Sequence, residues 1–118
     1  MSVGFAGNAS AAVPTPSNAL TVTALGTYAG GGAAAAEIVG FDPTTKRAFI
    51  TNGLTKSLDI VDFSTPSAPT LITSVSISAY GSDLTSVAVK NGVVAVAIPV
   101  APTGVHTPSN GVVVLFAT

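Results

Sequence analysis

The sequence predicts an all-β protein made of short antiparallel strands. Three observations lead to this: segments in which apolar and polar residues alternate, turn residues (Gly, Pro, Asn and Asp) between those segments, and an internal repeat of about 50 residues. No segment has the length and period of an ordinary helix. The four alanines at 33–36 are too short a run, because a stable isolated helix needs roughly 12 or more residues.

The chain divides into two regions. Residues 1–18 are predicted to form a flexible leader, or a strand exchanged with another copy, because Gly, Pro and Asn interrupt every pattern there. Residues 19–118 are predicted to form a single β module. Its first strand is expected at 19–25, where aliphatic residues alternate with threonines.

Seven further strands are expected, each between turn signals. They cover residues 37–41, 47–51, 58–63, 70–77, 86–89, 93–98 and 111–116. The last strand is almost wholly apolar, with Val112, Val114 and Phe116 on one face and Val113 and Leu115 on the other. A strand that is apolar on both faces is typical of a buried position in a sheet.

The turns between these strands have a physical basis in the sequence. Asp42 can cap the backbone of its own turn, and Pro43 presets φ at the second turn position. Asn52-Gly53 gives a second turn signal. Asn91-Gly92 predicts a tight hairpin, because both residues tolerate the positive φ angles that a two-residue hairpin turn requires.

The strands form two similar units. The first runs through 37–41, 47–51 and 58–63, and the second through 86–89, 93–98 and 112–116. A period near 50 residues with about four short strands per unit is typical of β-propeller blades. We therefore predict about two antiparallel, propeller-like blades. The alternative is a β-sandwich of seven or eight strands, which a chain of this length could also form.

Three sequence runs resemble one known family. Ala36–Asn52 (AEIVGFDPTTKRAFITN) is similar to the opening blade of the choice-of-anchor I proteins, which are large secreted bacterial propellers. Ser57–Pro69, with its D-x-S-x-P-x-x-P ending, resembles a strand of that family and of LVIVD-type repeats. Thr85–Ala97 resembles the start of the second blade. The resemblance covers residues 20–117 and implies the N-terminal two-blade portion of a propeller.

The same resemblance implies an extracellular or cell-surface location in a bacterium. Some members of the family are described as esterase-like or phosphatase-like, but no catalytic residue of the family maps onto this chain. We therefore expect no catalytic residues here, and no activity from this chain alone.

Composition excludes several classes of protein. Only 8% of the residues are charged and the net charge is -1, so the chain has no basic patch for nucleic acid. It has no cysteine, which excludes disulfides and thiolate metal sites. Its longest apolar run, Val93–Ala101, contains Pro99 and is too short for a transmembrane helix, which needs about 20 residues.

Few side chains could carry chemistry. His106, the one histidine, is expected in a solvated loop, and Glu37 at a strand end beside backbone amides, Lys46 or Arg47. Asp59, Asp62 and Asp83 could contribute to a calcium site, which takes six to eight oxygen ligands. No calcium-loop motif is present, so capping or cross-strand roles are preferred for these aspartates, and no cofactor is expected.

The functional hypothesis is a structural or interaction module. Two blades leave apolar sheet faces uncovered, so we expect other copies, or further blades of a longer chain, to pack there. The predicted assembly interface is Val112, Val114 and Phe116. The alternatives are the N-terminal part of an esterase- or phosphatase-like propeller and a carbohydrate- or ligand-binding module.

Overall fold

Seven β-strands make up the protein in the computed structural model, which describes residues 19–99 and 110–118. The predicted leader, 1–18, lies outside the described residues. In chain order the strands are β1 (Ala36–Asp42), β2 (Arg47–Asn52), β3 (Ser57–Asp62), β4 (Thr70–Ser76), β5 (Ser86–Lys90), β6 (Val93–Ile98) and β7 (Val112–Ala117). The described part contains no helix, so the all-β prediction is confirmed.

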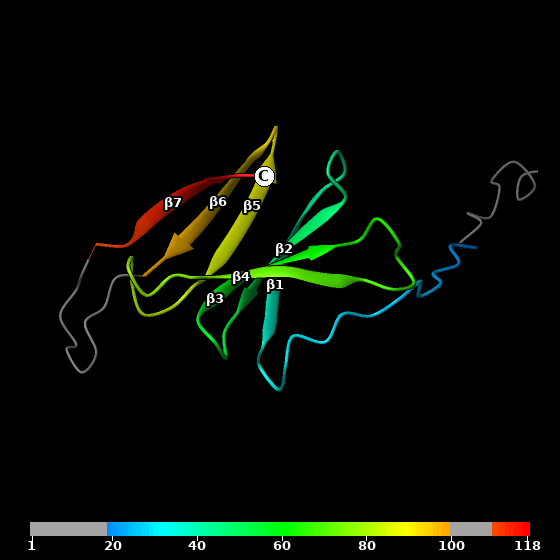
Figure 1. Cartoon of the computed structure of the whole chain (residues 1–118), viewed down its shortest axis with the longest axis horizontal. Coiled ribbons are helices and arrows are strands. Elements are labelled where there is room, and N and C mark those ends of the chain that lie inside the picture. The colour runs from blue at the N-terminus through cyan, green and yellow to red at the C-terminus, as the bar shows by residue number, and fades with distance from the viewer. Residues whose placement is uncertain (1–18, 100–109) are drawn as a thin grey trace, which may run out of the picture.

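The strands form two antiparallel sheets in which neighbours in sequence are neighbours in space. The first sheet has the order β1-β2-β3-β4 and the second has the order β5-β6-β7. Figure 1 shows the two sheets side by side, with β7 at the far end of the second. The predicted repeat is therefore real: β1, β2 and β3 correspond in order to β5, β6 and β7. Within the described residues β4 has no counterpart.

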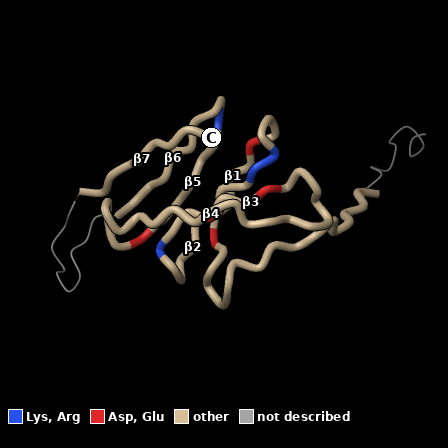
Figure 2. The backbone as a smooth tube through the Cα atoms, viewed as in Figure 1, with Lys and Arg blue, Asp and Glu red and all other residues tan. Residues whose placement is uncertain are grey.

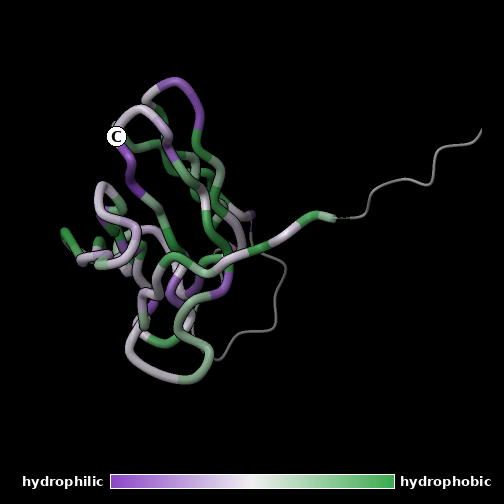
Figure 3. Tube along the Cα trace, turned by 90° about the vertical axis from the view of Figure 1, so that its right-hand side faces the viewer, coloured by the Kyte–Doolittle hydropathy of each residue, from purple (hydrophilic) through white to green (hydrophobic). Residues whose placement is uncertain are grey.

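The expected strand at 19–25 is not formed. Residues 19–30 adopt no regular secondary structure. Leu20 and Val22 are 85% and 83% exposed, so the alternating side chains have no sheet to pack on. Figures 1 and 3 show this segment as an extended chain that leads away from both sheets. Alternation indicates the ability to form a strand, but a strand also needs a partner for its backbone.

The first two hairpins are built in the same way. At the first turn, Asp42 accepts hydrogen bonds from the Thr44 amide (3.0 Å) and the Thr45 hydroxyl (2.8 Å), as the sequence predicted. At the second, Asn52 Oδ1 accepts from the amides of Leu54 and Thr55, both at 3.1 Å. A lysine with positive φ then closes each turn: Lys46 at 57° and Lys56 at 54°.

The third hairpin uses a shorter turn. Asn91 and Gly92 have φ angles of 51° and 79°, and Lys90 pairs directly with Val93 across them. Positive φ at both central residues is the geometry of the two-residue turn that suits the twist of a hairpin. The Asn-Gly prediction is therefore confirmed.

One hydrophobic core lies between the two sheets. It joins the inner face of the first sheet to the inner face of the second and includes the chain between them. Its buried members are Phe49, Leu58, Ile77, Leu84, Val87, Val94, Val96 and Ile98. The two sheets approach closely at β1 and β5, where a side chain at Gly40 would place its Cβ 2.7 Å from Cγ2 of Val89. The inner faces are therefore satisfied within the chain.

Candidate functional site

The most connected polar group of the described residues is the carboxylate of Asp59, in the middle of β3. Asp59 is only 3% exposed. Its Oδ1 accepts hydrogen bonds from the hydroxyls of Ser57 (3.1 Å) and Ser74 (2.6 Å), and its Oδ2 accepts from Asn52 Nδ2 (2.9 Å) and the Tyr28 hydroxyl (3.4 Å). These donors come from β2, β3, β4 and the segment before β1.

The register of the sheet brings these donors together. In the antiparallel pairings Asn52 is opposite Ser57, and Asp59 is opposite Ser74, so all four side chains lie on the same face of the first sheet. This is the face turned away from the second sheet. Because successive side chains of a strand alternate between faces, Leu58 points instead into the core.

The chain before β1 forms the remaining wall of this site. Asn52 Nδ2 also donates to the Gly30 carbonyl at 3.1 Å, and Gly31 has a φ of 100°, which suits glycine. Burial, and then the neighbouring Asp59 carboxylate, raise the pKa of the Tyr28 hydroxyl, so Tyr28 stays a neutral donor at physiological pH. An open pocket of about 500 Å³ lies between Tyr28–Gly31 and β3 and β4.

The arrangement around Asp59 favours a structural role for this carboxylate over a catalytic one. A carboxylate has about four lone-pair positions, and four donors already occupy them. The other titratable group that contacts it is the phenol of Tyr28. We interpret the cluster as a polar clamp that ties the entry segment to three strands, and we call it the Asp59 network.

The three aspartates considered for calcium make separate contacts. Asp62 accepts from the Ser64 amide at 2.7 Å, and hydrogen bonding to the side chain and then the amide of Ser64 lowers the pKa of the Asp62 carboxyl. Asp83 accepts from Lys56 Nζ at 3.0 Å and from the Leu84 amide at 2.9 Å. Among the described residues no three His, Cys, Asp or Glu side chains come together as a metal site would require.

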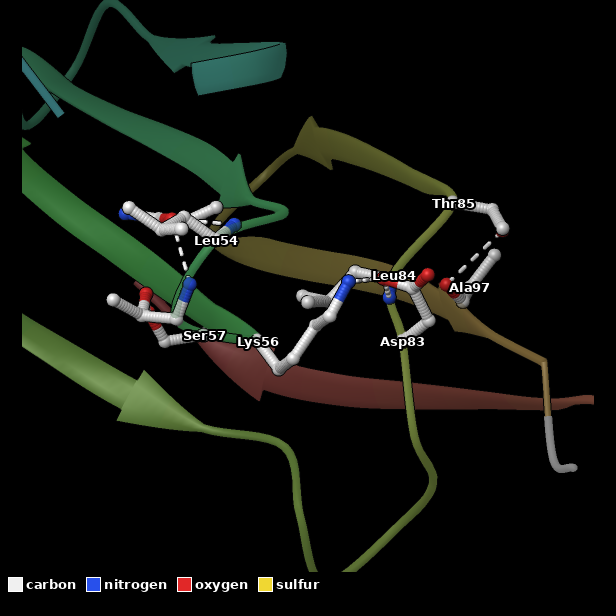
Figure 4. Close-up of polar contacts among 9 residues, drawn as sticks. Leu54, Lys56, Ser57, Asp83, Leu84, Thr85 and Ala97 are labelled. Atoms are coloured by element: carbon white, nitrogen blue, oxygen red, sulfur yellow. Dashed lines mark hydrogen bonds and ion pairs between the residues drawn. The ribbon is translucent and has the colours of Figure 1, made fainter. Parts of the chain in front are cut away.

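The Lys56–Asp83 ion pair links the two repeats at their surface (Figure 4). It joins the turn after β2 to the loop before β5, and the Lys56 hydrogen bond lowers the pKa of Asp83. Beside it, the Thr85 amide and hydroxyl both donate to the Ala97 carbonyl, at 2.9 and 3.2 Å. The Lys56–Asp83 ion pair therefore acts as a link between two elements of the chain.

The expected contact of Glu37 with Lys46 or Arg47 is wrong, whereas its expected contact with backbone amides stays a prediction. Arg47 pairs with Asp42 in the β1–β2 register, so Arg47 and Lys46 lie at the other end of that hairpin from Glu37. The Glu37 carboxylate instead lies beside Gly53, where a Cβ would come within 2.8 Å of it. His106 lies outside the described residues.

The predicted interface residues fall into two groups. Val114 and Phe116 pack partly against the core of their own chain, and the ring of Tyr80 meets Phe116 edge-on at 6.5 Å. Val112, at the start of β7, remains exposed. The opposite face of β7 is the more open one, because Val113 and Leu115 are 66% and 65% exposed. The predicted interface itself stays a prediction.

Each sheet therefore has some exposed apolar area on its outer face. On the second sheet the β6–β7 register groups Val113 and Leu115 with Val93, Ala95 and Ala97, and we call these five residues the β7 outer face. On the first sheet Val39 and Phe41 are exposed beside a smaller buried cluster. That cluster contains Ala48, Ile50 and Val61, with Tyr28 and Phe63 packed against it.

Charge is nearly absent from these outer faces. Figure 2 shows the charged residues mainly at turns and strand ends. All of the charged side chains lie in the described part, and only Asp59 occupies the middle of a strand. The Asp59 carboxylate accepts hydrogen bonds from four donors. The β7 outer face therefore offers neighbours shape and apolar area, and Lys90, opposite Val93 at the hairpin end, is the charged residue that the register places on the same side of the sheet.

The fold and these surfaces define the class of protein: a small antiparallel β module with two sheets, some exposed apolar area on their outer faces and a structural polar network. The chain belongs to the choice-of-anchor I family, because residues 37–118 match the model of the choice-of-anchor I domain. The resemblance found in the sequence is thereby confirmed, and it indicates a surface-associated β module. No curated protein and no solved structure matches the chain significantly.

The described residues contain no helix long and apolar enough to cross a membrane.

Sequence analysis missed the Asp59 network, although one signal was present. Asp59 lies between Leu58 and Ile60, within its expected strand, and a carboxylate in such a position needs hydrogen-bond donors from other strands.

Proposed function

We propose that this protein is a structural interaction module of an extracellular or cell-surface bacterial protein, and that its sheets are successive propeller blades. The observation that carries the proposal is the exposed β7 outer face. In a propeller, each blade packs its faces on its two neighbours. The shared core between the two sheets supports this reading, and the β7 outer face offers a further apolar surface for other copies or for further chain segments.

The energetics favour a covered state for this face. Burial of one Val or Leu side chain contributes about 1.5–3 kcal/mol. Val113 and Leu115 are both about two-thirds exposed, so covering the pair contributes roughly 2–4 kcal/mol, before the smaller neighbours are counted. The alanines at 95 and 97 keep the face shallow, so that another sheet can approach it closely.

The proposal is tested by the mass of the chain in solution, measured by light scattering across a range of concentrations. We expect the wild-type chain to self-associate, and Leu115→Lys to shift the equilibrium toward monomer. Leu54→Lys is the matched control, because Leu54 is a similarly exposed leucine that lies in the β2–β3 turn instead. A wild-type chain that remains monomeric at high micromolar concentration contradicts self-association.

No arrangement among the described residues favours the enzymatic or the carbohydrate-binding alternative, so neither is put forward. The pocket beside the Asp59 network does have convergent polar groups. Its donors and acceptors satisfy one another, so the groups that a bound substrate would use are already engaged.

A further inference from the structure

The two sheets differ by one strand. In the first sheet β4 pairs along the whole of β3, from Ser57 opposite Ser76 to Asp62 opposite Thr70. In the second sheet β7 occupies the position of β3, and no strand of the described residues pairs with its outer edge. The inner edges of β1 and β5 are both unpaired, so the first sheet shows which edge of the repeat takes a fourth strand.

An unpaired edge that is long and apolar is an association surface. β7 has six residues, Val112–Ala117, with no charge and no proline. Natural edge strands usually carry charged residues, proline or a bulge that prevents pairing with another chain. β7 has none of these, and its ladder to β6 is regular from Val112 to Ala117. The strand is therefore suited to pair on its second side.

The described residues also contain a strand-forming segment that has no partner. Leu20–Leu25 reads Leu-Thr-Val-Thr-Ala-Leu, with alternating aliphatic and threonine residues and no charge. It is similar in composition to β4, which reads Thr-Leu-Ile-Thr-Ser-Val-Ser, and is one residue shorter. In the described part of the chain, residues 19–25 take part in no backbone hydrogen bond.

We propose that Leu20–Leu25 of one copy adds to β7 of a second copy as a fourth strand, antiparallel to β7 as β4 is to β3. The proposal deepens the proposed function, on whose self-association it rests, by naming the segment and the edge that meet. Six residues of donor strand face six residues of β7, so the donor satisfies the exposed backbone groups of the whole edge.

The geometry favours exchange between copies over pairing within one. Gly26 packs against the Pro66 carbonyl, where no side chain would fit, and Tyr28 bonds to Asp59. Both contacts hold the residues that directly follow Leu25 against the first sheet. Figure 1 shows Leu20–Leu25 at the opposite end of the molecule from β7. Because donor and acceptor lie at opposite ends, each copy can give a strand to one neighbour and receive one from another, a head-to-tail contact.

The first experiment removes the hydrogen-bond donors of the segment. Only every other N–H of an edge strand points to its neighbour, so Thr23→Pro/Ala24→Pro removes one needed donor in either register. We expect self-association at least about tenfold weaker by light scattering. Thermal unfolding of the monomer should not change, since these residues make no backbone hydrogen bond in the described structure. The matched control, Thr23→Val/Ala24→Val, keeps both donors and should retain full association.

The second experiment uses the absence of cysteine to identify the contact directly. Chains that carry only Val22→Cys are mixed with chains that carry only Val113→Cys and treated with a short bis-maleimide. We expect a cross-linked heterodimer, and a much weaker product when Leu54→Cys replaces Val22→Cys. A double variant, Val22→Cys/Val113→Cys, should cross-link between chains rather than within one.

Three outcomes would overturn the inference. Unchanged self-association of the double-proline variant would reject strand exchange while leaving the proposed function intact. Cross-linking of the double-cysteine variant within a single chain would reject exchange in favour of intramolecular closure. A monomeric wild-type chain would reject both the inference and the self-association on which it rests.

Discussion

Replacement of Asp59 by alanine tests whether the Asp59 network holds the fold together. The substitution removes an acceptor that serves four donors: Asn52, Ser57, Ser74 and Tyr28. Two of them, Asn52 and Ser57, are buried and cannot turn to bulk water. Asn52 keeps a second bond to Gly30, and the Ser57 hydroxyl keeps Thr55 as a neighbour at 2.6 Å.

The size of the effect follows from these contacts. A hydrogen bond to a charged group contributes about 1.5–3 kcal/mol, and a buried donor left without a partner costs about 1–3 kcal/mol. Because Asn52 and Ser57 each keep one other contact, the cost of removing their acceptor lies at the low end of the range for a buried donor. We therefore expect Asp59→Ala to lower the free energy of unfolding by about 2–4 kcal/mol, measured by urea denaturation.

Two controls separate the network from a general loss of packing. Ser74→Ala removes a single donor, which is itself exposed, and should cost about 1 kcal/mol or less. Amide hydrogen exchange of Tyr28–Gly31 should accelerate in Asp59→Ala, because the network ties that segment to the sheet. An Asp59→Ala variant within 0.5 kcal/mol of wild type (about the spread of ordinary surface substitutions) would refute the reasoning.

Three further changes have defined outcomes. Gly40→Val should lower the free energy of unfolding by about 1–3 kcal/mol in urea denaturation, because even its Cβ would lie 2.7 Å from Val89 Cγ2. Lys56→Ala should cost at most about 1 kcal/mol, and less in high salt, since its partner Asp83 is also half exposed. On acidification, stability should fall below about pH 4. The pKa of Asp83 is lowered from 3.8 in the fold, so its contribution is complete above 3.8 and is lost as the pH falls through the folded pKa. A titration of the thermal midpoint checks this, and Asp83→Asn should flatten it in part.

Local sequence patterns predicted most of the strands and turns of this protein. Strands β1 to β7 lie within a residue or so of their expected bounds, because each alternates between faces and ends at a turn residue whose side chain or φ angle acts locally. Asp42 and Asn91-Gly92 illustrate this, since their contacts involve residues no more than three positions away. Such features need no knowledge of the tertiary structure.

Features that depend on distant partners could not be predicted in this way. The Asp59 network joins residues up to 31 positions apart, and only the register of three strands brings them together. The alternation of β7 separated its two faces correctly but did not show that Val114 and Phe116 would turn toward the core. Segment 19–25 has the pattern of a strand without a partner among the described residues, so its local pattern was an incomplete predictor.

The positions of the β7 edge and of segment 19–25 indicate how copies of this chain would be arranged in an assembly. The β7 edge and the β7 outer face belong to the same strand at one end of the molecule, whereas segment 19–25 lies at the other end. In the proposed assembly one neighbour makes both contacts: its first sheet covers the β7 outer face and its Leu20–Leu25 pairs with the β7 edge. The two contacts then reinforce each other, because each one holds the neighbour in place for the other. Loss of either contact should weaken the other, so Leu115→Lys and Thr23→Pro/Ala24→Pro combined should weaken association less than the sum of their separate effects.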